Sequence, residues 1–589
     1  MKSFLKTVLA VVVGLGVFMT LIALFFIGSL VSAAISGEGS ASTKKNDVLV
    51  LKINGPVNEV EPAVPFNFSI LSGFSMNESY SLRGLVRAID LAKADKNVEG
   101  IYLNTDGMAA APATYEALHD ALVDFRAAGK WIVAYNNSYG TSQYYLASVA
   151  DSIFLNPMGG LTLDGMTSVI PYFKDAADKL GVEMQIFRVG TFKSAVEPYM
   201  LDHMSDANRL QTVTYLQEIW DKMMDEVAAS RGLDVDSLNA WANTALSYAA
   251  AEQLPAGLVD GLRHHNDMET IVKRMAGQKE SKKFHGIDHK KMLATGDDDE
   301  RGDEVAVLYA VGEIVDAAEG TELAIVGDKL SKEVDKLTKN KKLKAVVLRV
   351  NSPGGSVFAS EQIWKSLMDL KASGKTIVVS MGDYAASGGY YISTPADYIV
   401  AEPNTITGSI GVFGMIPNFG GIAQKVGVNF EEVKTHEFGT LTTMRAANEA
   451  ERQKIQAGIE RVYDIFLGHV ADSRGMTKDS VNVIAQGRVW TGTHALEIGL
   501  VDELGSLQTA VAKAVELAGI DPRKYHTKNY PETTDDFMDM FNQAEEDVTI
   551  RIADRLLGTD RQLEQAMRRI RRGSRVQAIM EEMPVFVGN

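Results

Sequence analysis

The chain contains no cysteine, and this absence excludes disulfide bonds, thiolate metal sites and a cysteine nucleophile. Positive charge is also scarce, because 59 Lys and Arg residues stand against 76 Asp and Glu residues, for a net charge of −17. An acidic balance argues against a nucleic-acid-binding protein, which needs a basic face. The 589 residues, 46% hydrophobic and 23% charged, are otherwise typical of a globular protein with more than one core.

A long uncharged run near the N-terminus, Val8–Ala34, predicts a membrane-spanning helix. At about 1.5 Å per residue it is longer than the ~30 Å needed to cross the hydrocarbon core. Lys2 and Lys6 precede the run, which favours a cytoplasmic N-terminus. Ser32-Ala33-Ala34 resembles a signal-peptide cleavage site, but a signal peptide has a shorter apolar region of about 7–15 residues. We therefore expect an uncleaved single-pass anchor in the inner (cytoplasmic) membrane, with the rest in the periplasm if the source is a Gram-negative bacterium.

The remainder of the sequence contains a tandem repeat of domain length. Residues 96–133 align without a gap with residues 341–378, and after a shift of one residue 144–181 align with 390–427. In each copy short apolar runs, such as Ala345–Asn351, alternate with helical patterns, and this alternation predicts an α/β fold with a mostly parallel sheet. The landmarks predict a membrane anchor and linker over 1–46, an N-terminal repeat over 47–295, a C-terminal repeat over 304–520 and a tail over 521–589.

Each copy lacks a motif that the other copy contains. The second copy contains NSPGGSV (351–357) and AASGGYY (385–391), where the first has DGMAAAP and GTSQYY. Conversely, the first copy contains VGTFKSAVEPYM (189–200), and the register places its Lys193 opposite Gly439 of the second copy. Complementary losses of this kind predict one composite site that is assembled from both halves.

Ser387 is the candidate nucleophile. It follows an apolar run and precedes Gly388-Gly389, so the expected strand-to-helix turn has bare backbone beside the hydroxyl. Upstream, Gly354-Gly355 also follow a predicted central strand, and the two glycine pairs together offer N–H donors for an oxyanion hole. The alternative is that both glycine pairs only form tight turns and that Ser387 caps a helix.

Four residues are candidates for the general base that a serine needs. The second copy offers His436, His469 and His494, and His436 lies in the segment that matches the lysine region of the first copy. Lys193 becomes a base if burial lowers the pKa of its amine from about 10.4 toward neutrality. Spacing alone does not place Lys193 near Ser387, and an ordinary lysine is a solvated surface residue.

The motifs AASGGYYIS, NSPGGSV, TGSIGVFG (407–414) and GTFKSAVEPYM resemble signal peptide peptidase A, or protease IV, in its tandem-repeat, membrane-anchored form. The resemblance covers nearly the whole chain and is weakest in the tail. It implies a caseinolytic-protease/crotonase-like α/β fold in each repeat and a Ser/Lys dyad of Ser387 and Lys193. Gly388, with Gly354 or Gly355, matches the oxyanion donors, whereas Ser409 matches no nucleophile and is interpreted as a structural turn residue.

The resemblance further implies a serine endopeptidase that degrades released signal peptides and other short hydrophobic peptides, as a membrane-bound homotetramer without metal, cofactor or nucleic acid. Whether the dyad forms within one chain or between neighbours stays open. Two other functions are also compatible with parts of the sequence: an acyl-CoA enzyme of crotonase fold, which requires neither anchor nor dyad, and a membrane scaffold that binds peptides without cleaving them. Substitution of Ser387 separates these alternatives from a peptidase.

Overall fold

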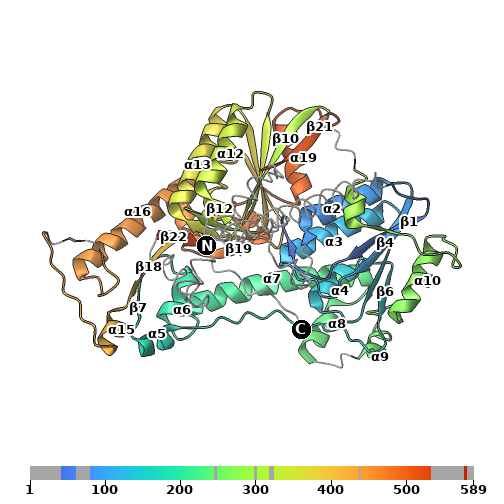
Figure 1. Cartoon of the computed structure of the whole chain (residues 1–589), viewed down its shortest axis with the longest axis horizontal. Helices are drawn as coiled ribbons and strands as arrows, with labels where there is room; N and C mark the ends of the chain where they lie inside the picture. Colours follow the sequence, from blue (N-terminus) through green and yellow to red (C-terminus); the bar gives the residue numbers. More distant parts are fainter. Residues whose placement is uncertain are drawn as a thin grey trace, which may run out of the picture.

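The computed structural model describes residues 42–60, 80–244, 249–296, 301–317, 324–436, 438–439, 441–531 and 576–579 (Figure 1). The expected membrane anchor lies outside these residues, as does most of the expected tail. Among the residues that are described, no helix combines the length and the apolar character needed to cross a bilayer.

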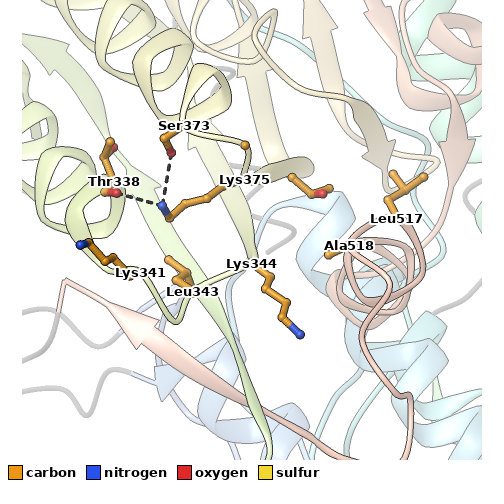
Figure 2. Close-up of a pocket in the computed structure, with 10 residues that line it drawn as sticks. Thr338, Lys341, Leu343, Lys344, Ser373, Lys375, Leu517 and Ala518 are labelled. Carbon is orange, nitrogen blue, oxygen red and sulfur yellow. Dashed lines mark hydrogen bonds between the residues drawn. The ribbon is translucent and has the colours of Figure 1, made fainter.

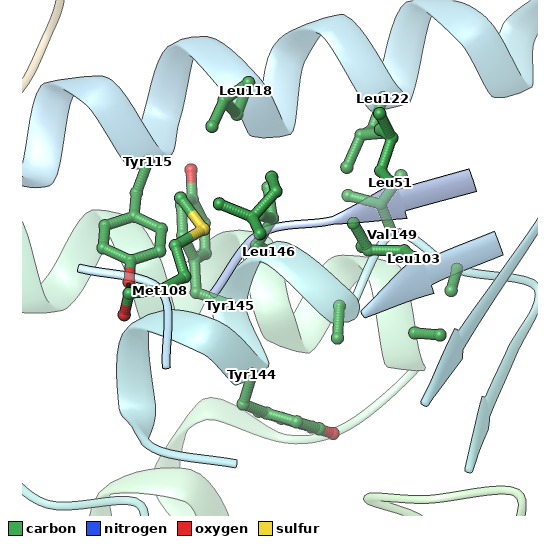
Figure 3. Packing of buried hydrophobic residues seen from close by; sticks show 14 of the residues in the cluster. Leu51, Leu103, Met108, Tyr115, Leu118, Leu122, Tyr144, Tyr145, Leu146 and Val149 are labelled. Carbon is green, nitrogen blue, oxygen red and sulfur yellow. Dashed lines mark hydrogen bonds between the residues drawn. The ribbon is translucent and has the colours of Figure 1, made fainter. Parts of the chain in front are cut away.

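The first repeat is built on a six-stranded sheet whose neighbouring strands are all parallel. The strands lie in the order β8 (Gly261–Leu262), β6 (Ser152–Leu155), β5 (Trp131–Asn136), β4 (Val98–Asn104), β1 (Asp47–Lys52) and β9 (Ile287–Asp288). A short pair, β2 (Val57–Asn58) and β3 (Tyr80–Ser81), lies apart from it. Helices cover the sheet, and in Figure 3 Leu122 of α3 (Pro112–Ala127) lies over Leu51 of β1 and Leu103 of β4. This burial explains why the strands are nearly continuous apolar runs.

The sheet of the second repeat contains the strand order of the first and adds two further strands. The path runs β19 (Val489–Thr491), β17 (Ile406–Gly408), β15 (Thr376–Ala386), β13 (Ala345–Ser352), β10 (Asp303–Val311) and β21 (Tyr525–Tyr530), with β16 (Tyr398–Ala401) and β20 (Glu503–Leu504) branching from β15. The order β20-β16-β15-β13-β10-β21 is the one shared with the first repeat, and β17 and β19 are the further strands. All pairs are parallel except β17 with β19. The predicted tandem α/β fold is therefore confirmed.

The expected start of the tail at residue 521 needs a correction. Strand β21 lies beyond it, yet pairs with β10 just as β9 pairs with β1 in the first repeat. The sequence alone does not reveal this correspondence, because β9 is only two residues long and shares no sequence pattern with β21. The sheet of the second repeat consequently continues to Tyr530.

Helices fill the rest of both repeats. The first has α2 (Leu82–Ala94), α4 (Thr141–Ala147), α5 (Lys174–Leu180), η2 (Ser194–Val196), α6 (Glu197–Met200), α7 (Asp206–Arg231), α8 (Val235–Thr244), α9 (Ala250–Gln253), α10 (His265–Met275) and α11 (His289–Leu293). The second has α12 (Gly327–Lys339), α13 (Val357–Ala372), α14 (Gly388–Tyr391), α15 (Gly420–Lys425), α16 (Glu449–Arg474), α17 (Lys478–Ile484), α18 (Gly492–Glu497) and α19 (Leu507–Leu517). The long helices α7 and α16 occupy matching places, and each ends at a left-handed glycine.

A third sheet joins the two repeats. Its order is β12 (Ala324–Val326), β11 (Glu313–Val315), β14 (Gly354–Ser356), β22 (Val576–Ile579), β18 (Val412–Asn418) and β7 (Glu183–Val189). Strand β7 comes from the first repeat and runs antiparallel to β18 of the second, with Val189 opposite Val412. This pairing carries the lysine segment of the first copy, which follows β7 directly, against the second copy.

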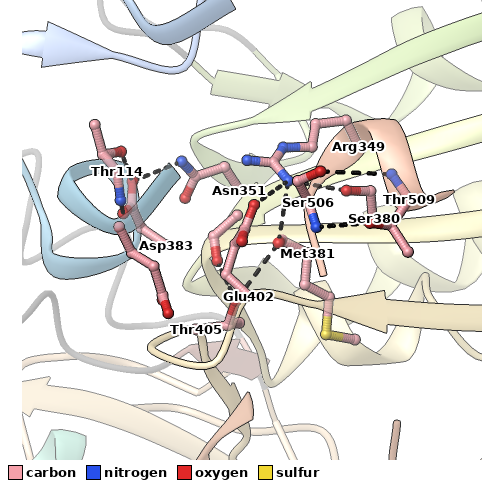
Figure 4. A network of polar contacts seen from close by, with 12 residues as sticks. Thr114, Arg349, Asn351, Ser380, Met381, Asp383, Glu402, Thr405, Ser506 and Thr509 are labelled. Atoms are coloured by element: carbon pink, nitrogen blue, oxygen red, sulfur yellow. Dashed lines mark hydrogen bonds and ion pairs between the residues drawn. The ribbon is translucent and has the colours of Figure 1, made fainter. Parts of the chain in front are cut away.

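Buried polar contacts also hold the repeats together (Figure 4). The backbone N–H and the hydroxyl of Thr114 in α3 both donate to Asp383 of β15, at 2.8 Å each, and Asn351 of the NSPGG motif donates to the same carboxylate at 3.0 Å. The guanidinium of Arg349 in β13 forms a bidentate pair with Glu59 of the first repeat, at 2.9 and 3.1 Å. Such a pair is costly to break, because removing either partner leaves a buried charge uncompensated.

Candidate active site

Ser387 lies in a sharp turn at the carboxyl end of the second sheet. Strand β15 ends at Ala386 and α14 begins at Gly388, so Ser387 is the single residue between them. Its φ of 55° and ψ of −113° are unfavourable for an L-residue, and a hydrogen bond from its N–H to Gly408 O at 2.8 Å helps to hold it there. The strand-to-helix setting expected from the sequence is therefore present, and the hydroxyl is presented on strained, fully buried backbone.

Two of the predicted oxyanion glycines approach each other beside this serine. A Cβ added to Gly388 would lie 3.1 Å from the backbone nitrogen of Gly355 and 2.8 Å from Ser360 Oγ. Gly388 is the first residue of α14, where N–H groups have no partner within the helix. The N–H of Gly354, in contrast, donates to Ser352 Oγ at 3.2 Å. Gly388 and Gly355 are thus better placed than Gly354 to bind an oxyanion.

The structure brings Lys193 to Ser387 within a single chain. Lys193 follows β7, and its Nζ lies 2.8 Å from Ser387 Oγ. The amine also donates to the hydroxyl of Ser409 at 3.0 Å and to the carbonyl of Ser409 at 3.1 Å. Neither proximity follows from sequence spacing, since 194 residues separate the first pair.

Close packing removes the lysine from water. Its side chain is 1% exposed. A Cβ on Gly487 would lie 2.7 Å from the lysine Cβ, and one on Gly411 would lie 3.2 Å from its Cδ, so both glycines make room for the aliphatic stem. Burial lowers the pKa of Lys193 to about 7, because a poorly solvated site disfavours the ammonium form. Within the described residues no carboxylate forms an ion pair with it that would restore the charge.

Both repeats hold the lysine segment in place. Arg188 of β7 donates to the carbonyl of Lys193 at 3.0 Å. The side chain of Gln211 in α7 donates to Phe192 O at 3.2 Å, and the N–H of Phe192 donates to Gln486 O of the second repeat at 2.8 Å. The amine therefore points at Ser387 from a loop that is fixed on two sides.

Ser409 contributes more than the turn that the sequence suggested. It does adopt a positive φ of 50°, and its N–H donates to Arg488 O at 2.7 Å. In addition, its hydroxyl and carbonyl are both partners of the lysine amine. The repeat alignment contains a signal for this role. Ser409 corresponds to Leu163 in the first copy, so the position is polar only in the copy that contains Ser387 and the glycine pairs.

The three candidate histidines lie elsewhere, and none contacts Ser387 in the part of the chain that the structure covers. His436 is exposed beside Thr435, at 3.0 Å. His469 stacks on Trp364 with ring centroids 3.9 Å apart. His494 Nδ1 lies 2.5 Å from a carboxylate oxygen of Glu218.

Among its described residues, the first copy has no equivalent site. Thr141 or Ser142 matches Ser387, depending on where the one-residue gap falls, and the hydroxyl of Thr141 donates to the carbonyl of Asp164 at 3.0 Å. Its N-terminal neighbour Gly140 caps α4. The hydroxyl thus serves the local turn.

A surface cavity lies at the opposite end of the second sheet (Figure 2). It is lined by Lys344, which precedes β13, and by Thr376, the first residue of β15, whereas Ser387 follows the last residue of that strand. The ammonium of Lys375 in its wall donates to Thr338 O at 2.8 Å and to Ser373 Oγ at 3.2 Å. The cavity is therefore separate from the Ser387 site.

Comparison with known proteins agrees with this geometry. The family model described as "Peptidase family S49" matches residues 124–282 and 369–521, which contain Lys193 and Ser387 respectively. The chain belongs to peptidase family S49. "Protease 4" of Salmonella typhi is 38% identical over 515 residues, covering 84% of this chain and 82% of the relative. "Protease 4" of Haemophilus influenzae is 35% identical, with coverages of 87% and 85%.

Shorter members of the family match only part of the chain. The "Putative signal peptide peptidase SppA" of Enterococcus faecium is 37% identical over 183 residues, or 30% of this chain and 52% of the relative. Among solved structures, "ClpP1 from Listeria monocytogenes" matches 34% of this chain and 91% of its own, at 17% identity and a TM-score of 0.22. As a member of family S49, the protein is a serine peptidase.

Proposed function

We propose that this peptidase is an endopeptidase in which Ser387 is the nucleophile and Lys193 the general base. The 2.8 Å separation of Lys193 Nζ and Ser387 Oγ supports the assignment most directly. Burial supports it further, because an amine with a pKa of about 7 is substantially neutral at physiological pH and has a lone pair to accept the serine proton.

The reaction follows from the positions of these groups. Lys193 takes the proton of Ser387 as Oγ attacks the substrate carbonyl, and the N–H groups of Gly388 and Gly355 stabilise the resulting oxyanion. The lysine ammonium then protonates the leaving amine, which leaves an acyl ester on Ser387. Water, deprotonated in turn by the lysine, hydrolyses that ester and regenerates the site. Through both steps the two Ser409 contacts hold the amine in place.

Hydrolysis of an internally quenched hydrophobic peptide tests this assignment. We expect Ser387→Ala and Lys193→Ala each to lower kcat by at least ~10³-fold, because removing one member of such a unit removes most of its contribution. Ser142→Ala, in the corresponding turn of the first repeat, is the matched control and should retain wild-type activity, as should His436→Ala. Activity that survives Lys193→Ala but is lost in His436→Ala would replace the dyad with a Ser/His mechanism.

We further propose that the substrates are short hydrophobic peptides, including signal peptides after their release. The relative from Enterococcus faecium that carries a signal peptide peptidase name supports this class, as does an anchor that would keep the enzyme at the membrane where such peptides accumulate. The test compares cleavage of a synthetic signal peptide in detergent micelles with cleavage of a folded, soluble protein of similar length. Equal rates on both would contradict the proposed preference.

The proposed anchor is Val8–Ala34, with the repeats in the periplasm. Its length and the preceding Lys2 and Lys6 support this orientation. Membrane fractions of the full chain and of a chain lacking the run should differ, with only the full chain resisting extraction by carbonate at high pH. Protease added outside spheroplasts should reach the repeats of the full chain; protection there would reverse the proposed orientation.

We also propose a homotetramer in which chains join head to tail. Within the chain, β7 of the first repeat pairs with β18 of the second. The repeat register assigns Asn429–Thr435 as the counterpart of β7 and Met166–Tyr172 as the counterpart of β18. In the described part of the chain neither counterpart belongs to a strand ladder. A second copy can supply a pairing strand for each, and repetition of such a heterologous contact closes a ring.

Exposed apolar side chains on both counterparts support this contact. Val433 is 95% exposed and Val169 is 74% exposed, so both are accessible to a second chain. In detergent, light scattering of the wild type should give four times the 64.0 kDa chain mass. Val433→Lys should reduce the assembly, whereas Val483→Lys, at a site 82% exposed on α17, should not. A Val433→Lys protein of unchanged mass would refute the contact.

A further inference from the structure

One strand of the joining sheet comes from the C-terminal tail. Strand β22 runs antiparallel to β14, with Gly354 opposite Ile579 and Gly355 opposite Ala578. On its other side β22 runs antiparallel to β18, where Phe413 lies opposite Gln577. In the described structure β14 and β18 do not pair with each other, so β22 alone fills the slot between them.

Both walls of this slot belong to the active site. β14 contains Gly355, whose nitrogen lies beside Gly388, the residue after the nucleophile. β18 begins three residues after Ser409, which holds the lysine amine. A backbone that enters this slot therefore passes along the proposed oxyanion donor on one side and along the lysine-binding turn on the other.

An extended peptide is the ligand that such a slot accepts. Two facing strand edges offer unpaired N–H and C=O groups, and a peptide that adds as a strand satisfies both rows through its main chain. Main-chain recognition tolerates many side chains, which suits an enzyme that degrades varied peptides. The tail strand makes this kind of contact, and Ala578 lies directly opposite the oxyanion glycine.

We propose that Val576–Ile579 is an internal ligand of the peptide-binding slot, which competes with substrate from within the same chain. The inference rests on the proposed function of this site. A tethered segment acts at an effective concentration that reaches the millimolar range, so even a weakly binding tail occupies the slot for much of the time. Substrates displace the tail, and the apparent affinity for substrate falls by the fraction of slots that are free.

The test disrupts the tail strand without touching the catalytic groups. Ala578→Pro removes a ladder N–H and cannot pair in the middle of a sheet, whereas Glu581→Pro changes the tail outside the strand and is the matched control. For hydrolysis of an uncharged fluorogenic peptide, we expect Ala578→Pro to lower KM about threefold to tenfold with kcat unchanged. A synthetic peptide of residues 575–582 should then inhibit this variant competitively.

A binding measurement keeps the inference separate from the proposed catalysis. In Ser387→Ala proteins, fluorescence anisotropy of a labelled hydrophobic peptide should show tighter binding when Ala578→Pro is added, and no change when Glu581→Pro is added. Equal affinities overturn the internal-ligand inference even if the wild type hydrolyses peptides. Tighter binding supports it even if the wild type proves inactive, in which case only the proposed function fails. An intact mass showing that the wild type cleaves its own chain within 576–579 would identify the tail as a substrate and overturn its role as a competitor.

Discussion

The pH dependence of activity provides a direct test of Lys193 as the base. Lysine ordinarily has a pKa of 10.5, and burial lowers that of Lys193 to about 7. Because only the neutral amine accepts a proton, the active fraction rises with pH: about one molecule in ten is active at pH 6 and about nine in ten at pH 8. We therefore expect kcat/KM to rise about tenfold between these pH values and to level off above them.

The assay is chosen so that only the enzyme titrates. Initial rates are measured at substrate concentrations well below KM, on an internally quenched peptide without ionisable side chains, in buffers of constant ionic strength. The single inflection should survive in His436→Ala and His494→Ala, which remove imidazoles that lie away from Ser387. A profile that is flat from pH 6 to 9, or an inflection that disappears in either histidine variant, would refute the reasoning.

Four further outcomes follow from the same contacts. Lys193→Met should raise the midpoint temperature of thermal unfolding, most at low pH. The unfolded lysine binds its proton up to pH 10.5 but the folded one only up to about 7, so the buried lysine destabilises the folded state by up to about 5 kcal/mol below pH 7 and by about 2 kcal/mol at pH 9. The substitution removes this destabilisation, partly offset by the hydroxyls that it leaves unpaired. If the gain in midpoint does not shrink from pH 6 to pH 9, the lysine is not held neutral by burial. Ser409→Ala should lower kcat about tenfold without changing KM, since it loosens the amine but leaves the substrate slot intact. Gly388→Ala should lower kcat by about 10²–10³-fold in a protein with a wild-type circular dichroism spectrum, because the added Cβ enters the oxyanion position. Glu59→Ala should cost about 3–5 kcal/mol in urea unfolding, because it leaves the Arg349 guanidinium buried without its partner; a change below ~1 kcal/mol would show that the pair contributes little.

The sequence predicts much of the fold because the repeat is visible in it. Apolar runs such as Ala345–Asn351 become buried parallel strands with little ambiguity, since both faces of the sheet are covered. The setting of Ser387 is predictable for a similar reason: an apolar strand followed by small residues and two glycines permits few conformations other than a tight turn. These signals depend on neighbouring residues alone, so they can be recognised in a single sequence without knowledge of tertiary contacts.

The contacts between repeats are not predictable in this way. Nothing in the pattern of Glu183–Val189 indicates that it pairs with a strand of the other repeat, because an alternating pattern predicts a strand without identifying its partner. The role of Ser409 depends on that pairing, and so does the distance between lysine and serine. The tail boundary was misplaced for a related reason, since strand β21 contains polar residues at most positions and is held by its neighbour rather than by apolar periodicity.

The crossing of β7 from one repeat into the sheet of the other also sets the order in which the enzyme can become active. Lys193 is synthesised long before Ser387, and the strand that positions it has no partner until Val412–Asn418 have been made. A chain whose synthesis is interrupted before that point therefore lacks the proposed dyad. With Lys193 as the proposed base, an unfinished chain would therefore be inactive toward its neighbours.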